Sequence, residues 1–130
     1  MIIDESDLDL DEDVCLHLGQ PFTGVARAHH PGGELKREAA YADGFEQGVC
    51  REWYADGQLR IEWTAVRGVV QGTLREWHEN GEPKVVATYS RGVELTYEEW
   101  DEAGALEVRR ELDPDSPLAS YAEGSEPGSD

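Results

Sequence analysis

The chain has few of the residues that bind metals or form disulfides. Its 130 residues include two cysteines, four histidines and one methionine. Two cysteines, Cys15 and Cys50, are too few for a disulfide framework, so we expect free thiols in a reducing compartment. No cysteine or histidine pair has zinc-finger spacing, and the adjacent His29 and His30 would point to opposite faces of a strand. The sequence therefore predicts no metal site and no cofactor.

Catalytic motifs are also missing. The glycines are not followed by the G-K-[ST] of a phosphate-binding loop, and no serine lies in a nucleophile motif. Carboxylates are plentiful, but Glu52, Glu76 and Glu99 recur at a nearly constant spacing, whereas a catalytic pair would occur once. We therefore expect a protein that is not an enzyme and has no catalytic residues.

Basic residues are scarce, with 11 against 29 acidic residues, a net charge of -18 and a pI near 4.4. Such a balance argues against binding to nucleic acid or to an anionic membrane, because phosphates need a basic surface. It favours a basic protein partner that approaches under electrostatic steering. The alternative is that the acidic surface only keeps the protein soluble.

Long apolar runs are absent as well. No stretch approaches the roughly 18 apolar residues that cross a bilayer. The first ten residues lack the positive region and apolar run of a signal peptide. The expected location is the cytoplasm.

The acidic residues concentrate at the two ends. Residues 1–13 hold seven acids and residues 113–130 hold five, and neither segment has a base, which leaves 17 acids and 11 bases between them. We expect an acidic N-terminal tail over 1–13, a repeat domain over 14–112 and a disordered acidic C-terminal tail over 113–130. Residues 14–22 resemble half a repeat, an extra strand that caps the array.

The middle of the chain repeats every 24 residues. Residues 48–59 read G-V-C-R-E-W-Y-A-D-G-Q-L, and residues 72–83 read G-T-L-R-E-W-H-E-N-G-E-P. Related segments occur one period earlier, at 24–35, and one period later with a single deletion, at 95–106. A period of this size indicates an array of one supersecondary unit.

Each repeat has the pattern of a β-hairpin. A three-residue turn that ends on glycine suits all four repeats, because a two-residue turn would force Ala103 to a positive φ. The turn glycines are Gly33, Gly57, Gly81 and Gly104, and a second series, Gly44, Gly68 and Gly92, marks tight turns between repeats. The predicted fold is all-β, an elongated antiparallel meander of about four 24-residue hairpins.

The three-residue turn also predicts which residues face each other. Trp53 should face Leu59, Arg51 should face Ile61, and Val49 should face Trp63. Glu52 should lie opposite Arg60, and Glu76 opposite Lys84, as ion pairs on a wet face. The other face would be mostly apolar, and a partner, the tails or curling of the sheet would have to cover it.

The pattern G-x-x-x-x-W-Y-x-D-G-x-L, followed by a short strand and another glycine, resembles the variant MORN repeat. In particular, residues 16–112 resemble the YwqK-type antitoxin family of bacteria. The resemblance implies a non-enzymatic protein that binds and neutralises a cognate protein toxin. His29 departs from the pattern because it replaces the repeat tryptophan, and Glu98 departs because it replaces the repeat arginine.

Tryptophan and arginine residues are the candidate partner-binding residues, because interface hot spots use both. A column of Trp53, Trp77 and Trp100, with Trp63 beside it, should share its face with Arg27, Arg51 and Arg75. A dry core would not hold three guanidinium groups, so part of this face should be open to solvent. The alternative is that the tryptophans serve only as the hydrophobic core of the repeats. The predicted binding residues are Arg51, Trp53, Trp63, Arg75, Trp77 and Trp100.

Three functions remain open from the sequence. The first is an antitoxin or immunity protein against a basic toxin that attacks nucleic acid. The second is a general protein-interaction scaffold. The third, lipid binding as in some MORN-repeat proteins, is disfavoured by the negative charge. Open end strands would also permit self-association.

Overall fold

The structure is a computed structural model that describes residues 1–123. The elements are, in chain order, β1 (Ile2–Asp4), the 3-10 helix η1 (Glu5–Asp7), β2 (Asp9–Asp11), β3 (Val14–His17), β4 (Gln20–Pro21), β5 (Gly24–His29), β6 (Leu35–Ala42), β7 (Phe45–Trp53), β8 (Leu59–Val66), β9 (Val69–Val70), β10 (Gly72–Trp77), β11 (Pro83–Ser90), β12 (Val93–Trp100), β13 (Leu106–Glu111) and α1 (Pro117–Ala122).

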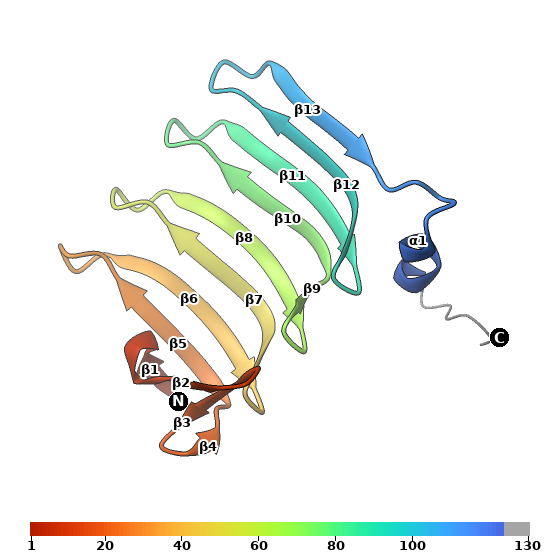
Figure 1. Ribbon diagram of the computed structural model, residues 1–130. Helices are drawn as coiled ribbons and strands as arrows, with labels where there is room; N and C mark the ends of the chain where they lie inside the picture. The colour runs from red at the N-terminus through yellow and green to blue at the C-terminus, as the bar shows by residue number, and fades with distance from the viewer. Residues whose placement is uncertain (124–130) are drawn as a thin grey trace.

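The main structure is a ten-stranded sheet in the order β1-β5-β6-β7-β8-β10-β11-β12-β13, with the short β9 paired to β8. Four successive hairpins, β5–β6, β7–β8, β10–β11 and β12–β13, lie side by side as one twisted layer (Figure 1). All neighbours are antiparallel except β1, which runs parallel to β5. The predicted all-β meander of hairpin repeats is therefore confirmed.

The hairpin turns have the predicted three-residue form. In the second hairpin the Tyr54 N–H donates to the Gln58 carbonyl at 2.8 Å, and the Gly57 N–H donates back to the Tyr54 carbonyl at 3.0 Å. The last turn residue has φ between 86° and 96° in all four hairpins, which explains why it is always glycine.

The turns between hairpins contain two residues with positive φ. The pairs are Asp43–Gly44, Arg67–Gly68 and Arg91–Gly92, with φ near 50° followed by 80–89°. Such turns match the twist of antiparallel strands. The first residue of each also donates its N–H to a side chain 20 residues earlier, Thr23, Gln47 or Gln71, at 2.9, 2.8 and 2.6 Å. Each bond joins the beginning and the end of one hairpin, at the end opposite its three-residue turn.

The predicted register is correct next to the turn and wrong beyond it. Trp53 pairs with Leu59, but Glu52 then pairs with Ile61 because Arg60 is an extra residue, a β-bulge. Arg51 therefore pairs with Glu62 rather than Ile61, and Val49 with Thr64 rather than Trp63. All four hairpins shift at the same place, so the remainder of each second strand turns its side chains to the opposite face.

The bulge determines which residues share each of the two faces of the sheet. The Arg face carries Arg51 and Trp53 with their partners Glu62 and Leu59, and the equivalent residues of the other hairpins. The Trp63 face carries Cys50 and Glu52 with their partners Trp63 and Ile61. The two predicted ion pairs do form, with Arg60 3.1 Å from Glu52 and Lys84 3.6 Å from Glu76. Their predicted setting is wrong: Glu52 and Glu76 stand opposite Ile61 and Val85, on the face that also carries the core.

The core is small and lies on the Trp63 face. Ala39, Cys50 and Ala65 are 0–2 % exposed, and Tyr41 and Trp63 pack against them. The N-terminal residues cover this end: Phe22 is 2 % exposed, and its ring centroid lies 5.7 Å from that of Tyr41.

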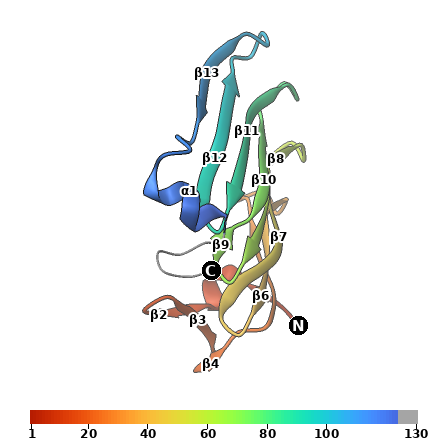
Figure 2. The same ribbon diagram turned by 90° about the vertical axis from the view of Figure 1, so that its right-hand side faces the viewer.

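Both ends of the chain contain more secondary structure than the sequence predicts. Strand β1 continues the main sheet, and β2, β3 and β4 form a separate three-stranded sheet instead of a half repeat. Helix α1 begins after Ser116, whose side chain accepts from the Leu118 N–H, and Ser90 Oγ donates to the Ala122 carbonyl. Of the predicted C-terminal tail, residues 124–130 lie outside the described part. Figure 2 shows β2–β4 and α1 on the same side of the layer in that view.

Candidate functional site

A row of charged residues crosses the Arg face from hairpin to hairpin. Strand register places one residue of each of the eight hairpin strands in this charge row, with alternating sign except at Val86. In order, the charge row is Arg27, Glu38, Arg51, Glu62, Arg75, Val86, Glu98 and Arg109.

The first two hairpins close the charge row with ion pairs. Arg27 Nε donates to Glu38 Oε2 at 2.8 Å, and Arg51 Nε donates to Glu62 Oε2 at 2.6 Å. These side chains are 29–42 % exposed, so water still reaches both pairs. The pairs explain how one sheet face holds guanidinium groups without burying an unpaired charge.

The third hairpin interrupts the charge row. Val86 stands opposite Arg75, where the first two hairpins have a glutamate. Arg75 is exposed and forms no ion pair or hydrogen bond with another residue of 1–123. Its other neighbour, Glu62, already accepts from Arg51. The third hairpin therefore presents an uncompensated cation.

An aromatic and aliphatic row lies beside the charge row, next to the hairpin turns. It pairs His29 with Leu35, Trp53 with Leu59, Trp77 with Pro83, and Trp100 with Leu106. The three tryptophans are partly exposed. A hollow of about 300 Å³ lies between the last two hairpins, lined by Glu82, Pro83, Val86, Trp100 and Gly104. The apolar part of this hollow adjoins the gap at Val86.

The structure brings together five of the six predicted partner-binding residues. Arg51, Trp53, Arg75, Trp77 and Trp100 lie on the Arg face. Trp63 lies on the opposite face, against the Ala39–Cys50–Ala65 core. The prediction that it belongs to the same surface is wrong, because the bulge at Arg60 reverses the facing of the strand that carries it.

A second series of repeated contacts was not predicted. His30 Nε2 donates to the Trp53 carbonyl at 2.9 Å, Tyr54 Oη to the Trp77 carbonyl at 2.6 Å, and His78 Nε2 to the Trp100 carbonyl at 2.8 Å. Each bond joins one hairpin to the next. The signal in the sequence is a polar ring at the same position of three repeats, 24 residues apart.

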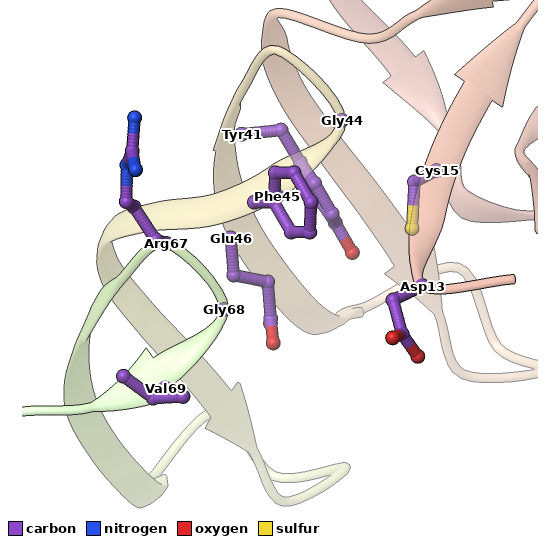
Figure 3. A pocket seen from close by; sticks show the side chains of 9 residues that line it. All are labelled: Asp13, Cys15, Tyr41, Gly44, Phe45, Glu46, Arg67, Gly68 and Val69. Atoms are coloured by element: carbon purple, nitrogen blue, oxygen red, sulfur yellow. The ribbon is translucent and has the colours of Figure 1, made fainter. Parts of the chain in front are cut away.

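A second hollow, of about 360 Å³, lies where the N-terminal residues meet the Trp63 face. Figure 3 shows Asp13 and Cys15 on one side, and Tyr41, Phe45 and Glu46 on the other. Arg37 links the two sides, with its guanidinium 3.5 Å from both Glu5 and Glu46.

The two thiols and the Tyr41 hydroxyl near this hollow are held in their protonated forms. Burial, and then the negative charge of Glu46, raise the pKa of the Cys50 thiol and of the Tyr41 hydroxyl to about 12 each. Burial also raises the pKa of Cys15. Thiols of this kind are poor nucleophiles at neutral pH. Among residues 1–123, no three His, Cys, Asp or Glu side chains gather closely enough to hold a metal ion.

The repeats are the part of the chain that is similar to a known protein family. Residues 46–65 and 70–91 match the family model described as MORN repeat variant. No curated protein matches the chain. A solved structure described as "Crystal structure of GtfA/B complex bound to UDP and GlcNAc" is 16% identical, with a TM-score of 0.35, over 71% of this chain and 19% of that chain. The matched ranges fall on β7–β8 and β10–β11, so the similarity to the MORN repeat variant covers the second and third hairpins.

Proposed function

We propose that the protein is a non-enzymatic antitoxin or immunity protein that binds and neutralises a cognate bacterial toxin. MORN repeats are consistent with a protein-interaction scaffold, and an antitoxin is a scaffold of this kind whose partner is one toxin. One observation carries it: the Arg face is an open sheet surface that presents Arg51, Trp53, Arg75, Trp77 and Trp100 together. Tryptophan and arginine are the residues on which protein interfaces most depend.

The charge of the chain indicates the kind of toxin. A net charge of -18 attracts a basic protein and speeds its diffusional approach. Proteins that act on nucleic acids carry basic surfaces, because they contact phosphates. A basic, nucleic-acid-targeting toxin is therefore the proposed partner, and an acidic inhibitor could occupy its phosphate-binding surface.

The direct test is co-expression with the product of the adjacent gene. We expect that product to be toxic alone, to be harmless with this protein, and to co-purify with it. The association rate should be high at low salt and should fall markedly by about 0.5 M salt, where the Debye length is only a few ångströms. A harmless product that does not co-purify would refute the proposal, and a salt-independent rate would refute the electrostatic part.

A general interaction scaffold in the cytoplasm, unrelated to toxins, is the second candidate function. It is favoured by the repeat match, which covers the second and third hairpins and carries no information about a toxin. Affinity purification that returns several unrelated proteins would support the scaffold. Within residues 1–123, no helix has the length and apolar character needed to cross a bilayer.

A further inference from the structure

We propose that the gap in the charge row at Val86 is the specific recognition point of the Arg face. It would bind a protein segment that brings a carboxylate to Arg75 and an apolar side chain into the adjoining hollow. This inference rests on the proposed function, because it assumes that the Arg face binds a protein, and it adds where the contact is centred and which chemistry the partner supplies.

The first two hairpins show which ion-pair partner Arg75 lacks in the third. In the first two hairpins the arginine of the charge row is neutralised across the hairpin by Glu38 or Glu62. In the third hairpin the same arginine position faces Val86, and Arg75 remains exposed without a partner among residues 1–123. A carboxylate from another molecule could take the place that the missing glutamate would occupy. Bidentate arginine–carboxylate contacts are among the stronger polar contacts that an interface can form.

The hollow beside Val86 would hold the apolar side chain of the partner. It is lined by the aliphatic groups of Pro83 and Val86 and by the indole of Trp100, and its volume of about 300 Å³ would hold one large apolar side chain. Glu38 and Glu62 place a carboxylate where Val86 places methyl groups. The same substitution that frees Arg75 therefore also makes this part of the surface apolar. Interface hot spots are enriched in tryptophan and arginine and lie in pockets, and here Trp100 lines the hollow while Arg75 lies beside it.

A local carboxylate is compatible with a basic partner. The net charge of -18 acts over a distance and governs the rate of encounter. Arg75 acts only at contact distance, where it would select one acidic group within a basic surface and fix the orientation of the complex.

The test uses a random 12-residue peptide library displayed on phage, with the full chain immobilised as target. We expect the wild-type protein to enrich peptides with an acidic residue close to a large apolar residue. Val86→Glu should supply the missing partner of Arg75 and abolish this enrichment. Val49→Glu is the matched control, because Val49 lies on the same face, is 43 % exposed, and makes the same chemical change away from the gap.

A charge reversal and a solution measurement complete the test. Arg75→Glu should change the enriched peptides from acidic to basic. A synthetic wild-type-selected peptide should bind at least about 30-fold more weakly to Val86→Glu, as expected when a hot spot is lost. It should also shift the indole N–H resonance of Trp100 and leave that of Trp63 unchanged. Circular dichroism of each variant shows whether it has folded.

The outcomes separate this inference from the proposed function. Equal enrichment by wild-type protein and Val86→Glu, no enrichment by the wild type, or the same loss in Val49→Glu would overturn the inference. The toxin co-expression experiment, repeated with Val86→Glu, gives an independent result. If the wild type neutralises the toxin and folded Val86→Glu does so equally well, the proposed function stands and the site at Arg75 is refuted.

Discussion

Arg51 and Glu62 lie opposite each other across the second hairpin, with Nε of the arginine 2.6 Å from Oε2 of the glutamate. The two residues are 11 positions apart, as are Arg27 and Glu38 in the first hairpin. A hairpin with a three-residue turn and no bulge would pair Arg51 with Ile61 instead. The ion pair therefore depends on the extra residue, Arg60, and not on the turn alone.

The ion pair itself should contribute little to stability. Arg51 and Glu62 are 42 % and 36 % exposed, so water screens their attraction. A double-mutant cycle with Arg51→Ala and Glu62→Ala should give a coupling free energy of about 0.2–1 kcal/mol. Urea unfolding measures it, and a coupling above about 2 kcal/mol would contradict the assignment of this pair to an open surface.

Deletion of Arg60 should leave the register of the second hairpin unchanged. Without Arg60, Ile61 follows Leu59 directly and still faces Glu52, so Trp63 stays opposite Cys50 in the core. The deletion and Arg60→Ala should both retain the fold, because each removes only surface ion pairs with Glu52 and Glu76. Thermal melting of both variants tests this, and a deletion variant that melts far below Arg60→Ala would contradict the register proposed for the deletion.

Gly44 and Gly68 form a matched pair for testing the N-terminal cover. Both are second residues of inter-hairpin turns, with φ of 89° and 83°, so alanine at either place carries a similar backbone strain of about 1–2 kcal/mol. A Cβ at Gly44 would clash with Val14 Cγ1, whereas a Cβ at Gly68 has its nearest contact, with Phe45, at 3.5 Å. Gly44→Ala should therefore destabilise more than Gly68→Ala and should increase hydrogen exchange at Val14 and Cys15. Equal effects would mean that the N-terminal residues do not pack on this turn.

Tyr54→Phe should weaken the junction between the second and third hairpins. The substitution removes the 2.6 Å hydrogen bond to the Trp77 carbonyl and leaves the ring in place. We expect a loss of about 1 kcal/mol in the free energy of unfolding, with faster hydrogen exchange near Trp77. Tyr121→Phe is the control, because that ring is exposed and contacts Arg91 through its face. An effect at Tyr121 as large as that at Tyr54 would contradict the proposed junction.

Stability should fall as the pH rises from about 9 to about 12. The pKa of Cys50 is raised from 9.0 to about 12, and that of Tyr41 from 10.0 to about 12. Over this range the unfolded chain releases protons that the folded chain retains, so alkali favours unfolding. Cys50→Ala and Tyr41→Phe should each reduce the pH dependence of unfolding by denaturant. An unchanged dependence in the double variant would show that these groups do not cause it.

The same environments predict which cysteine reacts. Cys50 is fully buried, whereas Cys15 is partly exposed beside the hollow of Figure 3. Iodoacetamide at mildly alkaline pH should label Cys15 slowly, because the pKa of this thiol is raised, and should leave Cys50 unmodified until the protein unfolds. Mass spectrometry with and without urea distinguishes the two sites. Early modification of Cys50 would contradict the packing of the small core.

The sequence alone determined the repeat, the turns and the class of fold. Glycine at Gly57 and its equivalents is required locally by a positive φ, and turn residues act over a few bonds, so sequence spacing reveals them. The ion pairs of Glu52 with Arg60 and of Glu76 with Lys84 form although the strand pairing differs from the prediction, because the bulge residues Arg60 and Lys84 remain close to these glutamates. The position of Arg51 and Trp53 on one face also followed, because they lie two residues apart on one strand.

Only the tertiary structure decided the bulge, the face of Trp63 and the arrangement of the two ends. Nothing in the sequence next to Arg60 identifies it as a bulge residue. Whether a bulge forms depends on pairing energies summed over both strands. The bulge places Arg51 opposite Glu62 and Trp63 opposite Cys50. The 11-residue spacing of arginine and glutamate was the one available signal. Likewise, composition makes residues 1–13 acidic, but whether Ile2–Asp4 remains free or pairs with β5 depends on an open sheet edge that exists only after the hairpins have assembled.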